Sequence, residues 1–268
     1  MAQELVLPPV GYGTWQLDDN QARQCVAQAI CDGYRLVDTA MRYHNEVGVG
    51  QGVKESGISR SEILVSTKLR GGDQGREQTK KAFFASLRNL GLDYVDIYYI
   101  HWPLPRLGLY LESFETMLEL KAQGLIKHLG VCNFPNEYLE NIQAEFGVYP
   151  EVNQFELHPG FPQTQWVDFC QERNIQVQGW GVIGRGRGLL DNREVNKLAQ
   201  KYGCSPATIC ISWAHQRGIS SLVKSATRER WLSNLQSAFA DLTKTEMEIL
   251  DQVNFPRTSK DPITDEEY

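Results

Sequence analysis

The sequence has no uninterrupted apolar stretch of the length that a membrane-spanning helix needs. Its first residues, Met1 to Glu4, contain no basic region and precede no long apolar run, so they do not resemble a secretion signal. We therefore expect a protein that neither crosses a membrane nor carries a leader peptide, and we expect it in the cytoplasm.

Cysteine and histidine are present, but they lack the spacings that disulfide frameworks and metal sites require. The six cysteines are scattered, contain no CxxC pair and mostly fall inside apolar patterns, which predicts reduced and buried thiols. The five histidines are not spaced as metal ligands, either with one another or with these cysteines. We therefore expect no metal site.

The chain also lacks an excess of positive charge. Its formal net charge is −6, its pI is near 5.5, and it contains no long basic cluster. Such a charge balance does not favour nucleic acid or an anionic membrane surface as a partner. The hydrophobic content of 41% and the charged content of 22% are typical of a globular protein. We expect this protein to be a monomer.

What the chain does contain is a regular alternation of short apolar runs and helical segments, without a linker. Eight runs are predicted as strands: residues 9–15, the run that ends at Asp38, and residues 63–68, 95–102, 128–133, 151–156, 175–180 and 219–223. Eight strand–helix units in about this length predict an α/β fold, namely one (β/α)8 TIM barrel with a parallel sheet. We expect a single domain over residues 1–268, with a loose polar tail from about 255 to 268.

An open, doubly wound sheet is the main alternative fold. It is disfavoured because no early strand is followed by a GxGxxG loop and a helix. A glycine-rich segment does occur at residues 184–188, after a late strand. Alone, this segment is a weak signal for phosphate binding and is explained more simply as a flexible loop.

Ionisable side chains stand where three consecutive predicted strands end. These residues are Asp38, Lys68 and His101, and Tyr43 follows in the loop after the first of these strands. Each residue alone has an ordinary explanation, such as a helix cap, a surface charge or a core imidazole. Because a barrel brings the carboxyl ends of its strands to one mouth, we expect all four side chains to meet there.

The chemistry of such a group follows from its pKa values. A free tyrosine has a pKa of about 10. A close ammonium such as Lys68 is expected to lower that pKa by favouring the phenolate. A buried ammonium needs a counter-ion, which Asp38 can supply, and His101 can hold a carbonyl oxygen by a hydrogen bond. This site could protonate an oxygen while hydride reaches the carbon. No side chain delivers hydride, so a nicotinamide cofactor is expected.

The same residues lie in motifs that resemble the aldo-keto reductase family over nearly the whole chain. The first family signature is matched by residues 33–40, Glu46 and Val49-Gly50. Further family blocks are matched at residues 66–69, 92–96, 100–103, 130–134, 153–159 and 223–230. The compact loops are similar to those of bacterial members. One departure is Cys132, which replaces the usual serine beside Asn133 and is a poorer hydrogen-bonding partner.

The resemblance implies an NADPH-dependent carbonyl reductase with a catalytic tetrad of Asp38, Tyr43, Lys68 and His101, in which Tyr43 is the proton donor. The cofactor-binding residues that it implies are Cys132, Asn133 and Gln154 at the nicotinamide carboxamide, Trp180 on the nicotinamide ring, Gly181, Ile183 and Arg185 over the pyrophosphate, and Lys224, Ser225, Arg230 and Asn234 at the adenosine 2′-phosphate and adenine. Two cations and a hydroxyl near a helix N-terminus suit a dianionic phosphate, which favours NADPH over NADH.

The resemblance also implies a substrate pocket lined by Trp15 and Trp102 beside the tetrad. Their aromatic surface favours apolar or flat carbonyl compounds. The loop at 104–110 and the C-terminal tail are short, which predicts an open and permissive site. Small aldehydes, α-dicarbonyls such as methylglyoxal, and keto-sugar acids all remain candidates.

Two other functions are compatible with parts of the sequence. One is a cofactor-binding regulatory module of the same fold with little turnover, although no additional partner-binding segment is evident. The other is a barrel hydrolase or isomerase. That function would need a metal-ligand cluster or paired carboxylates at the strand ends, and the sequence indicates neither.

Overall fold

The computed structural model describes residues 4–236 and 239–264. Eight parallel strands form a closed barrel, in which each strand pairs with the next along the chain and β8 pairs with β1. The strands are β1 (Val10–Gly13), β2 (Leu36–Asp38), β3 (Leu64–Leu69), β4 (Val95–Ile100), β5 (Ile126–Cys132), β6 (Val152–Glu156), β7 (Gln176–Trp180) and β8 (Ile219–Val223). The predicted TIM barrel is confirmed, and the open sheet is excluded because the first and last strands pair.

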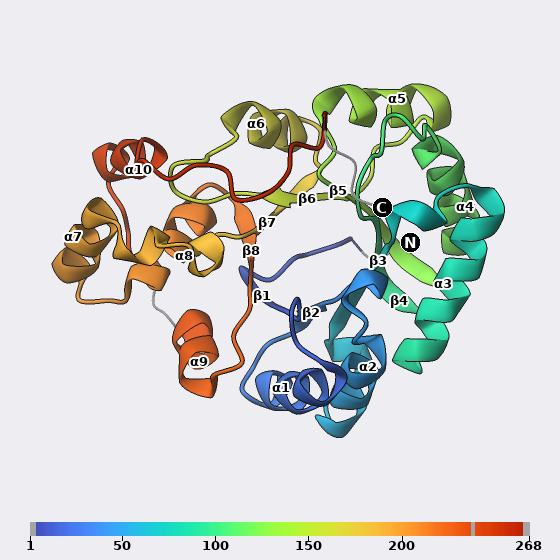
Figure 1. Ribbon diagram of the computed structural model, residues 1–268, viewed down its shortest axis with the longest axis horizontal. Helices are drawn as coiled ribbons and strands as arrows, with labels where there is room; N and C mark the ends of the chain where they lie inside the picture. The colour runs from blue at the N-terminus through green and yellow to red at the C-terminus, as the bar shows by residue number, and fades with distance from the viewer. Residues whose placement is uncertain (1–3, 237–238, 265–268) are drawn as a thin grey trace.

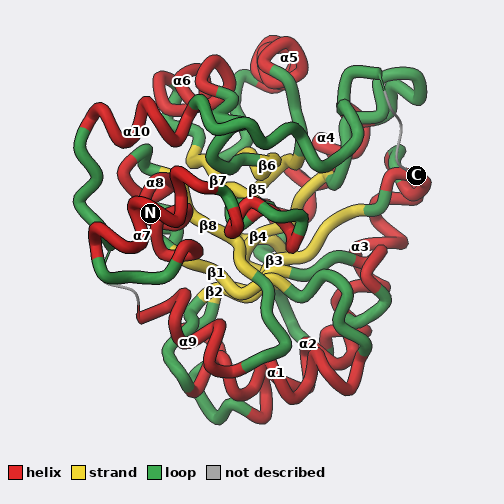
Figure 2. Tube along the Cα trace, turned by 60° about the vertical axis from the view of Figure 1, so that its left-hand side comes forward, coloured by secondary structure: helices red, strands yellow, loops and turns green. Residues whose placement is uncertain are grey.

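The α-helices lie outside the barrel and cover its strands (Figure 1; Figure 2). They are α1 (Asp19–Cys31), α2 (Glu46–Glu55), α3 (Arg76–Leu90), α4 (Tyr110–Ala122), α5 (Asn136–Phe146), α6 (Thr164–Glu172), α7 (Arg193–Tyr202), α8 (Pro206–Gln216), α9 (Arg228–Gln236) and α10 (Lys244–Asp251). Short 3-10 turns follow several strands, including η1 (Met41–Tyr43) after β2 and η4 (Gly184–Gly186) after β7. The connections after the strands therefore carry most of the irregular structure.

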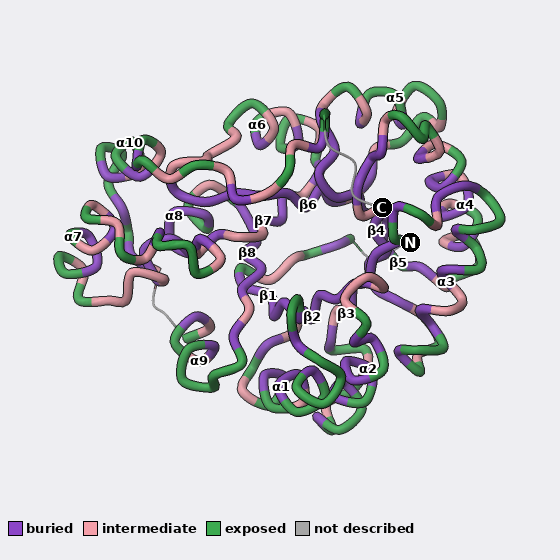
Figure 3. Tube along the Cα trace, in the orientation of Figure 1, coloured by how far each residue is buried: buried purple, intermediate pink, exposed green. Residues whose placement is uncertain are grey.

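The core has two layers, because the strands separate the barrel interior from the helices. Every residue of β4 is buried, as expected for a strand that faces the barrel interior on one side and helices on the other. Figure 3 shows the same pattern, with buried strands at the centre and exposed outer faces on the helices. This burial explains why several strands, such as β4, appear in the sequence as short and mostly apolar segments.

Local capping signals set the starts of several helices. Asp18 accepts from the backbone N–H of Gln21 at the start of α1, and Ser205 accepts from Thr208 at the start of α8. Thr243 forms a capping box with Glu246 at the start of α10. These caps satisfy backbone donors that the first helical turn leaves without partners, and the three helix starts agree with the sequence signals.

Some strand ends differ from the prediction. The strand expected at residues 95–102 ends at Ile100, three residues before the proline at 103, and His101 lies in a bend. The strand expected at residues 128–133 begins at Ile126, because Ile126 is buried and pairs with Val95. These shifts leave the barrel topology unchanged.

The prediction of a loose C-terminal tail is wrong for its first part. Thr258 donates from its backbone N–H and its hydroxyl to Glu156, each at 2.6 Å, and Ser259 also donates to this carboxylate. Glu156 is the last residue of β6 and is 2% exposed. A buried carboxylate needs donors, and the tail supplies them. Residues 265–268 of the predicted tail lie outside the described residues.

The Glu156 contacts predict a specific acid sensitivity. Burial opposes ionisation, but hydrogen bonds from His158, Ser259 and Thr258 lower the pKa of Glu156 from 4.5 to about 2. A lowered pKa stabilises the fold above about pH 4.5, and this stabilisation is lost as the pH falls toward about 2. Glu156→Gln cannot titrate, so its free energy of unfolding should fall less across this range, by on the order of 3 kcal/mol.

Chemical unfolding at a series of pH values checks this prediction. Glu55→Gln is the matched control, because Glu55 forms an exposed ion pair with Arg23. Its unfolding free energy should keep a pH dependence close to that of the wild type. Parallel pH curves for the wild type and Glu156→Gln would contradict the assignment.

Candidate active site

The four ionisable residues expected at the strand ends lie together at the carboxyl-terminal mouth of the barrel. Asp38 is the last residue of β2, Lys68 is the second-last residue of β3, and His101 directly follows β4. Tyr43 is the last residue of η1, in the loop after β2. The fold therefore confirms that these four side chains converge.

Lys68 and Asp38 form a buried ion pair at the base of this group. The Lys68 Nζ atom lies 2.6 Å from Asp38 Oδ2, and it also donates to the Thr39 carbonyl at 2.9 Å and to the Tyr43 hydroxyl at 3.5 Å. Burial alone would lower the pKa of Lys68, but the Asp38 carboxylate raises it above its usual value. Lys68 is therefore an ammonium at neutral pH.

The second oxygen of Asp38 is also bound. Its Oδ1 atom accepts from Ser66 Oγ at 2.8 Å and from Gln154 Nε2 at 3.1 Å. Ser66 was not among the predicted site residues. Its position two residues before Lys68 was the available signal, because alternate residues of a strand face the same side.

Burial raises the pKa of Tyr43 to about 12, and the Lys68 ammonium opposes this shift without reversing it. From the sequence, Lys68 was expected to lower the pKa of Tyr43 below its usual value, and that net direction is wrong. Burial outweighs the ammonium because it removes the phenolate from water. The neutral phenol is the form that can donate a proton, and an ammonium 3.5 Å from its oxygen favours the phenolate.

His101 is held in its neutral form. Burial lowers its pKa well below the usual value, and the cations Lys68 and Arg42 lower it further. Its ring meets that of Tyr43 edge to face, with 5.8 Å between the ring centres. A neutral imidazole has one N–H and can donate it to a carbonyl oxygen.

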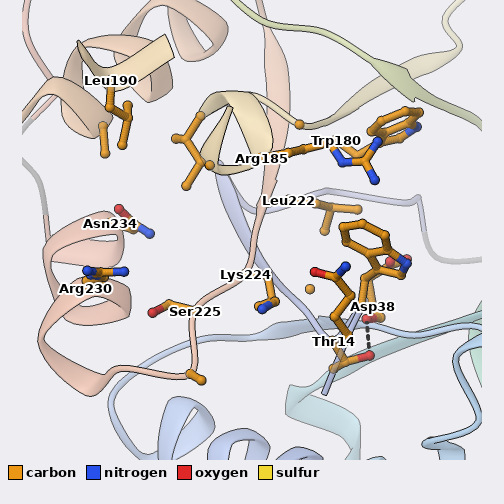
Figure 4. A pocket seen from close by; sticks show the side chains of 18 of the residues that line it. Thr14, Asp38, Trp180, Arg185, Leu190, Leu222, Lys224, Ser225, Arg230 and Asn234 are labelled. Atoms are coloured by element: carbon orange, nitrogen blue, oxygen red, sulfur yellow. Dashed lines mark hydrogen bonds between the residues drawn. The ribbon is translucent and has the colours of Figure 1, made fainter. Parts of the chain in front are cut away.

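A pocket of about 1130 Å³ extends from these residues to α9. The predicted site residues that line it are Trp15, Asp38, Tyr43, His101, Trp102, Asn133, Gln154, Trp180, Gly181, Ile183, Arg185, Lys224, Ser225, Arg230 and Asn234. Figure 4 shows Arg230 and Asn234 on one side, Asp38, Arg185 and Trp180 on the other, and Ser225 and Lys224 between them. The pocket therefore joins a reactive end to a cationic end.

Two predicted site residues, Lys68 and Cys132, lie beneath the pocket wall. From there Lys68 contacts the pocket residues Asp38 and Tyr43. Cys132 is 1% exposed and packs with Leu5 and Tyr99 in a small apolar cluster. Its position therefore does not support the expected direct contact with a cofactor.

Asn133 connects the tetrad to the aromatic wall of the pocket. Its Nδ2 group donates to the His101 backbone carbonyl at 3.1 Å, and its Oδ1 accepts from Trp180 Nε1 at 3.3 Å. Its backbone φ is 62°, in the left-handed region that asparagine tolerates better than most residues. These contacts fix the Trp180 ring at the end of β7.

Arg185 lies between two indole rings. Its guanidinium carbon is 4.3 Å from the centre of the Trp15 ring and 5.5 Å from that of Trp180. In Figure 4 its guanidinium lies beside Trp180, on the Asp38 side of the pocket and away from Arg230. This arrangement connects the loop after β7 with the loop after β1.

The opposite end of the pocket is formed after β8. Lys224 and Ser225 follow this strand directly, and Arg230 and Asn234 lie on α9. The Ser225 hydroxyl accepts from the backbone N–H of Thr227 at 3.0 Å, which shapes the turn before α9. The two cations predicted to bind a phosphate thus line the same pocket.

Several pocket residues were missed by the sequence analysis. Thr14 donates its hydroxyl to the backbone carbonyl of Asp38 at 3.0 Å (Figure 4). Arg42 lines the pocket beside Tyr43, and Leu190 and Leu222 contribute apolar wall. Arg42 could have been found from its neighbour in the sequence, whereas leucines in apolar runs carry no chemical signal.

Within residues 4–236 and 239–264, no helix combines the length and apolar character that crossing a membrane would require. Over the same residues, no three His, Cys, Asp or Glu side chains are grouped so that they could hold a metal ion.

Comparison with known proteins gives one consistent result. Residues 9–254 match the sequence model of the aldo/keto reductase family. Methylglyoxal reductase DkgA of Escherichia coli is 38% identical over 243 residues, which are 90% of this chain and 88% of the relative. A 9,11-endoperoxide prostaglandin H2 reductase of Trypanosoma cruzi is 38% identical over 92% of this chain and 88% of the relative.

Solved structures agree with these matches. The structure of a Gox0644 mutant in complex with NADPH has a TM-score of 0.90 at 36% identity, covering 97% of this chain and 94% of the other. A Bombyx mori aldo-keto reductase in complex with NADP has a TM-score of 0.85 at 31% identity, covering 92% of this chain and 89% of the other.

The buried ion pair predicts an asymmetric response to mutation. Lys68→Met leaves Asp38 as a buried charge without its counter-ion, and it should lower the free energy of unfolding by about 3–5 kcal/mol. The double variant Lys68→Met with Asp38→Asn removes both charges and should recover much of that loss. Chemical unfolding of the wild type, the two single variants and the double variant gives the coupling. Strictly additive losses would contradict the ion pair.

Proposed function

The chain belongs to the aldo/keto reductase family, and we propose that it is an NADPH-dependent carbonyl reductase in which Tyr43 protonates the carbonyl oxygen. One observation carries the assignment of Tyr43. The buried Lys68 Nζ lies 2.6 Å from Asp38 and 3.5 Å from the Tyr43 hydroxyl. A neutral phenol therefore stands in the pocket wall with a cation behind it.

The pocket fits a dinucleotide that carries an additional phosphate. It is about 1130 Å³ in volume and has an indole and amide groups at one end and two cations at the other. We propose that Asn133, Gln154 and Trp180 hold the nicotinamide, and that Gly181 and Ile183 lie over the pyrophosphate. Lys224, Ser225, Arg230 and Asn234 are proposed for the adenosine end. When bound, NADPH supplies the hydride, which no side chain can supply.

The protein side chains transfer the proton and stabilise the negative charge that its transfer leaves on the tyrosine. Tyr43 donates its phenolic proton to the carbonyl oxygen, and the Lys68 ammonium stabilises the resulting phenolate. Asp38 keeps Lys68 charged and in place. The neutral His101 donates its N–H to the same carbonyl oxygen and thereby orients the substrate.

The walls around Tyr43 indicate the class of substrate. Trp102 is 5% exposed and forms part of the wall, whereas Trp15 is 39% exposed at the rim. Indole surfaces favour flat or apolar groups next to the carbonyl. The relative from Escherichia coli is named a methylglyoxal reductase. We propose small aldehydes and α-dicarbonyls such as methylglyoxal as substrates, and keto-sugar acids as a further class.

The proposal includes a monomer that acts in the cytoplasm on its small-molecule substrate. All six cysteines are free thiols, which suits a reducing compartment. Sedimentation equilibrium tests the oligomeric state.

Replacing the proton donor tests the mechanism. Tyr43→Phe should reduce the turnover of aldehydes by at least about 100-fold, because general acid catalysis contributes roughly that much or more. NADPH oxidation with a panel of aldehydes measures turnover, and quenching of tryptophan fluorescence measures cofactor binding, which should persist.

Tyr98→Phe is the matched control, since this buried tyrosine does not line the pocket, and the control should turn over like the wild type. Full activity of Tyr43→Phe would overturn the assignment of the donor. Tight NADPH binding by the wild type without turnover of any carbonyl would support the regulatory module instead.

Selectivity for NADPH should depend on Arg230. Arg230→Gln removes a charge-assisted contact to the 2′-phosphate, and it should weaken NADPH binding by about tenfold or more while changing NADH binding little. Fluorescence titration with both cofactors measures the ratio of dissociation constants. The control is Arg193→Gln, an exposed arginine that does not line the pocket. An unchanged ratio in Arg230→Gln would contradict the phosphate site.

A further inference from the structure

Three polar side chains form a hydrogen-bonded chain inside the barrel, below the pocket. The Tyr99 hydroxyl donates to Gln178 Oε1 at 3.0 Å, and Gln154 Nε2 donates to the same oxygen at 2.7 Å. Gln154 and Gln178 are paired across β6 and β7, so their side chains project side by side. Tyr99 and Gln178 are fully buried and belong to no site assigned above.

The orientation of the Gln154 amide follows from the chemistry of its neighbours. Asp38 is paired with an ammonium and is therefore a carboxylate, which can only accept hydrogen bonds. The Gln154 atom that lies 3.1 Å from Asp38 Oδ1 must then be the NH2 group. Its second N–H donates to Gln178. Both amide hydrogens are thus used inside the barrel.

The orientation of Gln178 follows from the same reasoning. Its Nε2 group has no hydrogen-bond partner among the described residues. Turning the Gln178 amide over would place this NH2 group against the NH2 group of Gln154, so two donors would face each other. The carbonyl oxygen of Gln178 therefore stays between Gln154 and Tyr99.

Tyr99 is held firmly as the donor at the far end of this chain. A Cβ atom on Gly130 would lie 2.4 Å from the Tyr99 ring, so the glycine on β5 makes room for this tyrosine. Burial raises the pKa of Tyr99 well above its usual value, which keeps its hydroxyl protonated. The hydroxyl therefore remains a donor at any working pH.

The hydrogen-bonded chain determines which atom of Gln154 is left for a ligand at the pocket wall. Gln154 lines the pocket, whereas Gln178 and Tyr99 do not. With both N–H groups engaged below, Gln154 presents its carbonyl oxygen to a ligand as an acceptor. Cys132, which the resemblance places at the carboxamide, lies in the apolar cluster beside Tyr99. Recognition of an amide NH2 group then depends more heavily on Gln154.

We propose that Tyr99 and Gln178 are positioning residues, which hold the Gln154 carbonyl oxygen toward the pocket so that it accepts the N–H of the nicotinamide carboxamide. This inference rests on the proposed use of NADPH. It assigns a role to two buried side chains that touch neither cofactor nor substrate.

The test compares two cofactors that differ in one group. In the 3-acetylpyridine analogue of NADP⁺, a methyl group replaces the amide NH2, so a hydrogen bond to the Gln154 oxygen cannot form. Fluorescence titration gives the dissociation constant of each cofactor. For the wild type the analogue should bind about two- to tenfold more weakly than NADP⁺, the range expected for one hydrogen bond.

Two variants interrupt the chain at different points. Gln178→Met keeps the length of the side chain and removes the acceptor of one Gln154 N–H. Asp38 still binds the other N–H, so the amide does not turn over, but its plane is free to rotate about that bond and the affinity ratio should fall. Tyr99→Phe removes one donor to Gln178 and should lower the ratio partly. The matched control is Tyr98→Phe, on the adjacent residue of β4, whose hydroxyl has no hydrogen-bond partner among the described residues. This control should keep the wild-type ratio.

The outcomes separate this inference from the proposed function. A wild type that binds NADP⁺ and the analogue equally would overturn the role of the Gln154 oxygen. Wild-type ratios in both Gln178→Met and Tyr99→Phe would overturn the positioning role. Because Tyr99→Phe keeps the ring that packs against Gly130, it serves as the test if Gln178→Met does not fold. Failure of the wild type to bind either cofactor would instead refute the proposed use of NADPH.

Discussion

The buried ion pair between Lys68 and Asp38 is the interaction on which the barrel mouth depends. Two charges removed from water are tolerated only when their geometry and neighbouring hydrogen bonds compensate for the lost solvation. Here the compensating groups are the Thr39 carbonyl, the Ser66 hydroxyl and the Gln154 amide. They come from β3, from β6 and from the loop after β2, so the contacts that hold the ion pair beside Tyr43 also join separate parts of the barrel.

Most of the fold could be predicted from local signals. Short buried strands appear as apolar runs, and capping residues such as Asp18, Ser205 and Thr243 mark helix starts within a few residues of sequence. The anchored tail could not be predicted, because Thr258 meets Glu156 across 102 residues of chain. A polar tail indicates solvent exposure unless the buried carboxylate that it covers is already known.

The candidate site also has features that could be predicted from the sequence and features that could not. The tetrad could be predicted because parallel strands converge at one mouth, whatever their lengths. The raised pKa of Tyr43 could not, since the burial of a phenol is a property of the assembled barrel. Gln178 and Tyr99 lie inside predicted strands, and neither belongs to a motif that marks it as part of a site. Their proposed role can be inferred only once the pairing of Gln154 with Gln178 across β6 and β7 is known.

The pairing of β1 with β8 has a consequence for the synthesis of the protein. Val10 pairs with Ser221, so the barrel cannot close until more than two hundred residues have left the ribosome. Before that point β1 and the most recently made strand present open edges, which can pair with other chains. The cationic end of the pocket follows β8 directly. The growing chain therefore completes this pocket only when the open edges of its sheet have paired.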